Sequence, residues 1–317
     1  MRRRSRWILA AALVIATAAT GGAVATAAPV DVTLYLSVDG RDDANGDADS
    51  PLRTLSGARD RLAQTDSETA TILVRPGTYR ETATVDWSSV PQSKVTIQRA
   101  SGTERPVFDG SQVTGKAQYW VDTHGGPALD VWGMLVRNYQ TGGLRLDTDG
   151  NHVRNMIFEK IGNRHKPGGP GYAAVHMLGS SNNSVINNVF RDLENDDCGG
   201  CVHALYIAND SDGSVITGNR ISDVIGDPIR LRNGTDGNVI SDNEFSRSGG
   251  RGDNRAFVSF WVFRDTEVCG GGNLVTDNRY DGRRYDGSTG QPIAGSGAEP
   301  GLARCPSVIS ESGNVKT

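Results

Sequence analysis

The segment NVISDNEF at residues 238–245 decides the fold of this chain, because closely similar segments recur on both sides of it. The other copies lie at residues 184–190, 214–221 and 273–280, and a degraded copy lies at 153–158. Each copy is a short apolar strand followed by Asn, Asp or Gly residues that favour a turn. One such coil cannot bury its own apolar side, whereas stacked coils form a continuous core. The repeat therefore predicts an all-β solenoid.

Every full copy carries an asparagine two residues before an apolar residue. The asparagines are Asn188, Asn219, Asn243 and Asn278, and the apolar residues are Phe190, Ile221, Phe245 and Tyr280. An inward amide can bond to the turns above and below it, which satisfies polar groups inside a narrow solenoid. The alternative is that these asparagines only mark surface turns. Because the spacing is shared by the flanking apolar positions, we expect a buried asparagine ladder.

Helical periodicity is nearly absent, with one exception at residues 54–64. There Leu55, Ala58 and Leu62 share one face, and Thr54 precedes them as a suitable N-cap. We expect one helix at this place.

Three N-terminal segments resemble secreted β-helix proteins of the pectate-lyase-like superfamily: LYLSVDG at 34–40, SPLRTL at 50–55 and ILVRPGTY at 72–79. The resemblance implies a single-stranded, right-handed parallel β-helix whose first coil is capped by the helix near Thr54. It says little about activity, because the superfamily includes lyases, hydrolases, esterases, epimerases and binding proteins.

The first 27 residues read as a secretory signal peptide, with four arginines, an apolar run at 7–19 and small residues up to Ala27. The remaining residues, 28–317, are expected to form one β-helix domain. Its parts are an N-terminal cap at about 32–80, coils at about 81–280, and a C-terminal extension at 281–317 that lies outside the repeat. We expect a secreted, extracellular protein with no membrane partner once the signal is removed.

The four cysteines are an even number in an exported chain, which favours disulfides. We expect Cys198–Cys201 to close a short loop and Cys269–Cys305 to fasten the C-terminal extension. Removal of the four signal arginines takes the formal net charge from −4 to −8, which argues against nucleic acid and anionic membranes as partners. We expect a monomer.

Three tripeptides occupy equivalent places in successive coils: VHM at 175–177, LYI at 205–207 and IRL at 229–231. The middle residue of each lies nine residues before Val185, Val215 or Val239. Their outer members are apolar and should point inward, so the middle residues His176, Tyr206 and Arg230 should point outward on one sheet. Arg145 is expected one coil further along and Arg232 on the same face. His203 and Asp227 are expected at the edge next to the loops.

Extra residues gather in one connection of the coils, at 162–169, 194–200 and 247–253, whereas the coil through 224–228 has almost none. Long loops beside a short one predict a groove, and insertions in solenoids gather on the binding face. Arg164 and Lys166 in the first insertion are expected to bind an acidic ligand. The plainer interpretation is that these polar residues only cover the surface.

The predicted cluster suits β-elimination of a uronic acid polymer. That reaction neutralises the carboxylate, removes the proton at C5 and protonates the departing O4. Arg230 or Arg232 would pair with the carboxylate, His176 or His203 would be the base, and Tyr206 would be the acid. Further contacts to the glycan are expected from Arg145, Asp227, Arg164 and Lys166. The sequence therefore predicts a carbohydrate-active protein, namely a lyase for an acidic polysaccharide.

Three alternatives remain open. A C5-epimerase would use the same residues, and a glycoside hydrolase would need two carboxylates across the groove, such as Asp196 or Asp197 with Asp227. A non-catalytic carbohydrate-binding or adhesion solenoid would use Trp120, Trp132 or Trp261 as stacking platforms.

We expect no cofactor. Asp43, Asn45, Asp47 and Asp49 are spaced as in a calcium loop, but the closing glutamate is missing, so a solvated turn is favoured over a calcium site.

Overall fold

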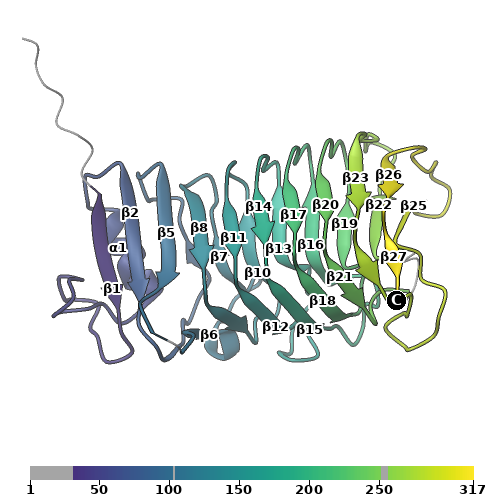
Figure 1. Cartoon of the computed structure of the whole chain (residues 1–317). Coiled ribbons are helices and arrows are strands. Elements are labelled where there is room, and N and C mark those ends of the chain that lie inside the picture. The colour runs from purple at the N-terminus through teal and green to yellow at the C-terminus, as the bar shows by residue number, and fades with distance from the viewer. Residues whose placement is uncertain (1–30, 103, 251–255) are drawn as a thin grey trace, which may run out of the picture.

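The computed structural model describes residues 31–102, 104–250 and 256–317, so the expected signal peptide lies outside the described residues. Over these ranges the chain winds repeatedly through three sheets, and the strands follow one another along the solenoid in Figure 1. All pairs between the strands of these sheets are parallel. The predicted all-β parallel coil is confirmed.

We call the three sheets A, B and C. Among the described residues they contain ten, nine and eight strands. Sheet A consists of β1 (Val32–Leu36), β2 (Thr69–Val74), β5 (Lys94–Arg99), β8 (Ala128–Trp132), β11 (His152–Arg154), β14 (Ser184–Ile186), β17 (Val215–Thr217), β20 (Val239–Ser241), β23 (Asn273–Thr276) and β26 (Ile309–Ser312). Sheet B consists of β3 (Thr78–Tyr79), β6 (Val107–Asp109), β9 (Leu135–Arg137), β12 (Ile157–Ile161), β15 (Val189–Leu193), β18 (Arg220–Val224), β21 (Glu244–Ser246), β24 (Arg279–Tyr280) and β27 (Val315–Lys316). Sheet C consists of β4 (Val85–Asp86), β7 (Tyr119–Asp122), β10 (Gly142–Leu146), β13 (Ala173–Leu178), β16 (His203–Ala208), β19 (Ile229–Leu231), β22 (Val258–Val262) and β25 (Ala294–Ala298).

The interior of the coils is one apolar cluster that runs from Leu34 to Val308. Phe158 and Phe190 stack within it on successive coils, with ring centroids 5.3 Å apart. The described part of the chain has no helix long and apolar enough to cross a membrane.

The sequence comparison places Val185 and Val215 at equivalent positions, and this detail is wrong by one residue. Val185 pairs with Ile216 and not with Val215. Val185 is fully buried and Val215 is 39% exposed, because a slip of one residue moves a side chain to the other face of a sheet.

The asparagine ladder is confirmed, since all four side chains are at most 1% exposed. The Oδ1 atom of Asn219 accepts bonds from the backbone N–H of Asn188 at 2.9 Å and from its amide at 3.0 Å. The amide of Asn219 donates to Val185 O and to Asn243 Oδ1, both at 2.9 Å. The amides thus satisfy the turn backbone from coil to coil.

The expected helix is α1 (Leu55–Leu62), and Thr54 caps it by accepting the backbone N–H of Gly57 at 2.9 Å. Its predicted apolar face is buried. The helix packs next to β1 and β4, at the N-terminal end of the solenoid in Figure 1. A short 3₁₀ turn at Gly110–Gln112 is the other helical element of the described chain.

The stretch from Asp281 onward does not lie outside the repeat. It supplies β25, β26 and β27, which pair with β22, β23 and β24 and complete a further coil. The sequence pattern missed this coil because glycines and serines replace its apolar strand residues. Both expected disulfides are present, Cys198–Cys201 and Cys269–Cys305.

Candidate functional site

A line of polar residues follows the outer face of sheet C, and we call it the sheet C row. Its members are successive register partners: Asp86, Asp122, Arg145, His176, Tyr206, Arg230 and Ser259. The residues on both sides of each member are buried, for example Val175 and Met177 around His176. Strand alternation therefore directs the row outward. The predicted order of Arg145, His176, Tyr206 and Arg230 agrees with the register.

His176 lies on this outer face but is only 7% exposed, because aromatic rings cover it. The Tyr172 ring stacks on it at 5.8 Å, and the Tyr206 ring meets it edge-on at 4.9 Å. On the opposite side the Tyr119 hydroxyl lies 2.8 Å from His176 Nδ1. Gly142 gives Tyr119 room to reach across β10, since a Cβ there would meet the Tyr119 ring at 2.5 Å.

Both histidines of the site are held uncharged. Burial, together with the nearby positive charges of Arg145 and Arg232, lowers the pKa of His176 to about 3. Burial, aided by Arg230, also lowers the pKa of His203 well below its ordinary value. His203 Nδ1 lies 2.7 Å from the carbonyl oxygen of Asp227, and the His203 ring lies 5.5 Å from that of Tyr206. A neutral imidazole can accept a proton, which an imidazolium cannot.

Tyr206 is contacted by Arg232, whose guanidinium donates a hydrogen bond to the tyrosine hydroxyl and also lies over the ring. The same guanidinium forms an ion pair with Glu267. Because Arg232 uses the oxygen of the hydroxyl as acceptor, the proton of Tyr206 remains available for donation.

Arg230 is buried in a compact polar group. Its Nη2 atom lies 2.6 Å from Asp227 Oδ2, and its Nε atom lies 2.9 Å from Ser259 Oγ. Asp227 is fully buried, and burial raises the pKa of its carboxyl although Arg230 opposes that shift. The Trp261 ring covers the guanidinium at 5.1 Å. Arg230 and Asp227 therefore face each other rather than the groove.

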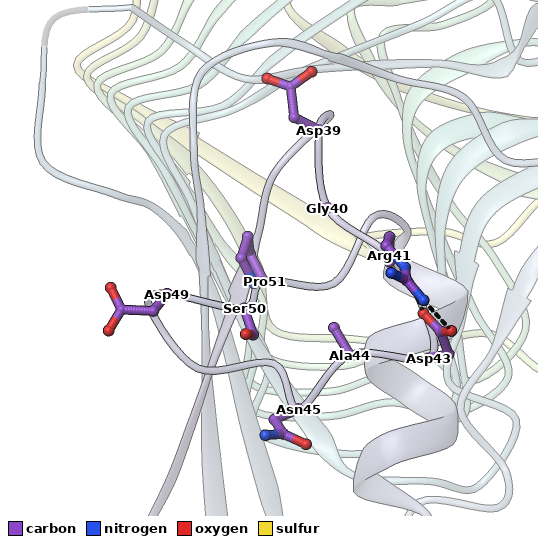
Figure 2. A pocket seen from close by; sticks show the side chains of 9 residues that line it. All are labelled: Asp39, Gly40, Arg41, Asp43, Ala44, Asn45, Asp49, Ser50 and Pro51. Atoms are coloured by element: carbon purple, nitrogen blue, oxygen red, sulfur yellow. Dashed lines mark hydrogen bonds and ion pairs between the residues drawn. The ribbon is translucent and has the colours of Figure 1, made fainter.

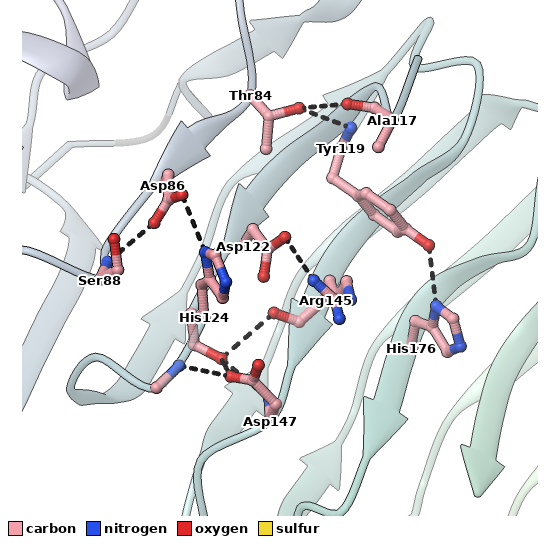
Figure 3. A network of polar contacts seen from close by, with 12 residues as sticks. Thr84, Asp86, Ser88, Ala117, Tyr119, Asp122, His124, Arg145, Asp147 and His176 are labelled. Atoms are coloured by element: carbon pink, nitrogen blue, oxygen red, sulfur yellow. Dashed lines mark hydrogen bonds and ion pairs between the residues drawn. The ribbon is translucent and has the colours of Figure 1, made fainter.

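Arg145 is the more accessible arginine of the row, with 32% of its side chain exposed. It forms an ion pair with Asp122 at 2.8 Å, and Figure 3 shows this pair next to the contact between Tyr119 and His176. Burial raises the pKa of the Asp122 carboxyl, against the effect of Arg145.

A cavity of about 410 Å³ adjoins this end of the row. Its lining includes Lys116, Tyr119, Asp122, Arg145 and Tyr172. Gly169 and Pro170, which close the first long insertion, form another part of its wall. The end of the first insertion thus lines this cavity, but the short connection at 224–228, beside which the groove was expected, does not.

Lys166 and Arg164 make contacts away from the row. Lys166 Nζ donates to the carbonyl oxygens of Gly110 and Val113, and burial lowers its pKa. Arg164 forms ion pairs with Glu194 at 2.9 Å and Asp196 at 2.7 Å. The structure thus unites seven of the nine predicted catalytic and binding residues and places these two in other clusters.

The side chains of the possible calcium loop do not converge. Asp43 forms an ion pair with Arg41 at 2.6 Å, and Asp47 accepts the backbone N–H groups of Asp49 and Ser50. Figure 2 shows Asp39, Asn45 and Asp49 pointing in different directions around a surface pocket. Within residues 31–102, 104–250 and 256–317 there is no group of three or more His, Cys, Asp or Glu side chains suited to a metal ion.

Sequence reasoning missed five residues of the site: Lys116, which precedes β7, and Tyr119, Asp122, Tyr172 and Glu267. Tyr119 and Asp122 belong to β7, which precedes the recognisable repeats, whereas Tyr172 and Glu267 lie in connections whose length varies. The tryptophans considered as platforms are not all accessible, since Trp120 is fully buried and Trp261 is 4% exposed.

Comparison with solved structures finds similar folds at low sequence identity. An alginate lyase from Paenibacillus sp. str. FPU-7 aligns over 90% of this chain and 95% of its own, with a TM-score of 0.50 and 15% identity. A pectate lyase, Pel9A, aligns over 80% of this chain with a TM-score of 0.46 and 15% identity. A rhamnogalacturonan lyase aligns over 87% with a TM-score of 0.46 and 16% identity.

The chain spans just under two thirds of the length of the latter two proteins, 63% of the pectate lyase and 64% of the rhamnogalacturonan lyase. At these identities the likeness concerns the fold alone. A search of curated protein sequences gave no match. The family comparison is more direct, because residues 129–294, just over half of the chain, match the sequence model of the right-handed β-helix region. Together with the three parallel sheets, this match establishes that the chain belongs to the right-handed β-helix family.

Proposed function

We propose that this protein is a polysaccharide lyase that cleaves an acidic, uronate-containing glycan by β-elimination. The observation that carries the proposal is the cavity beside His176, which combines two cationic side chains, Lys116 and Arg145, with the rings of Tyr119 and Tyr172. Its one carboxylate, Asp122, is already paired with Arg145. Such a lining suits a sugar ring that carries a negative charge.

In the proposed reaction Arg145 stabilises the negative charge that spreads onto the uronate carboxylate when C5 loses its proton. His176 is the base. With Nδ1 carrying the proton toward the Tyr119 oxygen, the lone pair of Nε2 is left to take the C5 proton. The electron pair of the C5–H bond forms the C4–C5 double bond, and the bond from C4 to O4 breaks.

Tyr206 supplies the proton to the departing O4. It is the register partner of His176, on the neighbouring strand, about 4.8 Å away along the sheet. One glycan thereby becomes two, and the new non-reducing end carries an unsaturated uronate.

The hydrolase alternative is less well supported. Asp227, the carboxylate common to the proposed pairs, is fully buried and held by Arg230 and Ser259. A C5-epimerase would need the same residues as the lyase, with the proton returned to the opposite face of C5.

A non-catalytic glycan-binding role is the second candidate, and one observation favours it. Three guanidinium groups near the row are already paired with carboxylates of this chain: Arg145 with Asp122, Arg230 with Asp227, and Arg232 with Glu267. A substrate carboxylate would have to compete with these partners.

The test is incubation with alginate, pectate and glucuronan, followed through the near-ultraviolet absorbance of unsaturated uronate. We expect absorbance to rise with one of these polymers, and the rate to fall at least a hundredfold in Tyr206→Phe and in His176→Asn. If the protein is retarded in a gel that contains the polymer but the absorbance does not change, the binding role replaces the lyase. Exchange of the C5 hydrogen with solvent deuterium, without cleavage, would identify an epimerase.

A further inference from the structure

Five planar groups form a continuous series across the outer face of sheet C. The series runs from Tyr172 through His176, Tyr206 and Arg232 to Phe263. Tyr172 and His176 lie 5.8 Å apart, and His176 and Tyr206 lie 4.9 Å apart. The guanidinium carbon of Arg232 lies 5.7 Å from the Tyr206 ring and 5.0 Å from the Phe263 ring.

The two ends of the series are exposed, whereas its middle is covered. Tyr172 is 48% exposed and Phe263 is 49% exposed, against 7% for His176. Each exposed ring offers an apolar face on which a sugar ring can pack.

Phe263 is held firmly in this exposed position. Its backbone N–H donates to Glu267 Oε2 at 2.9 Å, and Glu267 is the ion-pair partner of Arg232. Two residues further along, Cys269 is bonded to Cys305. These contacts fix the backbone, and the guanidinium carbons of Arg232 and Arg264 lie 5.0 Å and 5.8 Å from the ring centroid, so binding on the ring costs little conformational entropy.

Tyr172 is the exposed ring at the other end and forms part of the wall of the cavity with Lys116 and Arg145. It precedes β13, whereas Phe263 follows β22, three strands further along sheet C. Adjacent strands lie about 4.8 Å apart, so the two rings stand on the order of 14 Å apart along the solenoid axis. That distance exceeds one sugar ring.

We propose that Tyr172 and Phe263 are two separate sugar-stacking platforms that bind one glycan on both sides of the His176–Tyr206 pair. The apolar face of one pyranose packs on each ring, and the segment between them lies over the polar row. Because sugars are held on both sides, the protein binds an internal segment of the polymer. Where the inference concerns cleavage, it rests on the proposed lyase function. Binding of an internal segment then predicts endo-type attack.

Affinity electrophoresis tests the platforms without relying on catalysis. Wild type, Phe263→Ala, Phe263→Trp and Val268→Ala are run in gels that contain alginate, pectate or glucuronan. Val268 is the matched control, because it is an apolar residue in the same loop that is 57% exposed. We expect Phe263→Ala to bind the retarding polymer roughly fivefold more weakly, and Phe263→Trp and Val268→Ala to bind it as wild type does. Unchanged thermal unfolding of all variants verifies that the loop remains folded.

A second arm uses size-fractionated oligomers of the same polymer. Phe263→Ala should weaken binding of long oligomers but not of the shortest ones, which reach only the Tyr172 end, whereas Tyr172→Ala should weaken both. Equal binding by wild type and Phe263→Ala at every length, or no retardation of wild type by any polymer, overturns the inference. If binding depends on Phe263 but no polymer is cleaved, the lyase function fails and the platforms stand. If cleavage occurs with Phe263→Ala unimpaired at every length, the platforms fail and the lyase function stands.

Discussion

His176 is uncharged over the physiological pH range, because burial and two arginines lower its pKa to about 3. A neutral imidazole pressed between tyrosine rings makes the fold sensitive to acid. The unfolded chain takes up the proton at the ordinary pKa of about 6.5. Between that pH and about 3 the unfolded state binds more protons than the folded state, so the free energy of unfolding falls as the pH falls.

This coupling predicts that His176→Asn reduces the acid sensitivity. Between pH 7 and pH 5, wild type should lose about 2 kcal/mol more of its free energy of unfolding than the variant, as measured by urea titration. His124→Asn is the control, since His124 is exposed and Asp86 raises its pKa, which is a shift of opposite sign. Equal acid sensitivity in wild type and His176→Asn would contradict the placement of a neutral His176 under the tyrosines.

Arg145 has a close counterpart elsewhere on the solenoid. It pairs with Asp122 on sheet C at 2.8 Å, and Arg154 pairs with Asp130 on sheet A at 2.7 Å. Both pairs join neighbouring coils, but Arg145 also lines the cavity. We predict that Arg145→Gln lowers kcat/KM on the cleaved polyuronate about tenfold or more, because a charge-assisted contact to the carboxylate is lost. Arg154→Gln should leave it unchanged, and a comparable loss in both variants would show that the effect is structural.

At the scale of the element, the repeated strand and its asparagine turn explain what could be predicted. The apolar residues around His176, Tyr206 and Arg230 repeat with the coil, so their common face followed from strand alternation. Tyr119 and Tyr172 lie on an irregular early coil and in a loop, where no repeat indicates their neighbours. The burial of His176 depends on these two rings, so it could not be predicted from its own strand.

The asparagine ladder provides a prediction for the turn. Asn219→Ala would leave the buried N–H of Asn188 and the carbonyl of Val185 without their partner, which should lower the free energy of unfolding by about 3 kcal/mol. Asn314→Ala, at the last coil, should cost less, because its bonds are only partly buried and water can replace them. Urea unfolding of both variants measures the difference, and equal costs would count against burial as the cause.

At the scale of the molecule, each coil contacts mainly its two neighbours, so the ends depend on additional fastening. Cys269 and Cys305 are 36 residues apart and join the connection before β23 to the one before β26, whereas Cys198 and Cys201 are separated by 3. In the chain-entropy account the longer loop contributes about 4 kcal/mol and the short one less than half of that. The Cys269→Ser/Cys305→Ser variant should therefore be less stable than the Cys198→Ser/Cys201→Ser variant, as measured by thermal unfolding. The reverse order would contradict the role of this disulfide in fastening the last coil.

The molecule as a whole presents three long outer faces, and sheet C carries the proposed chemistry. A crystal structure of the Tyr206→Phe variant with a bound oligouronate tests this assignment most directly. We predict a sugar carboxylate within hydrogen-bonding distance of Arg145, and sugar rings along sheet C beside Tyr172. An oligouronate bound to the outer face of sheet A or sheet B, with the sheet C row unoccupied, would contradict it.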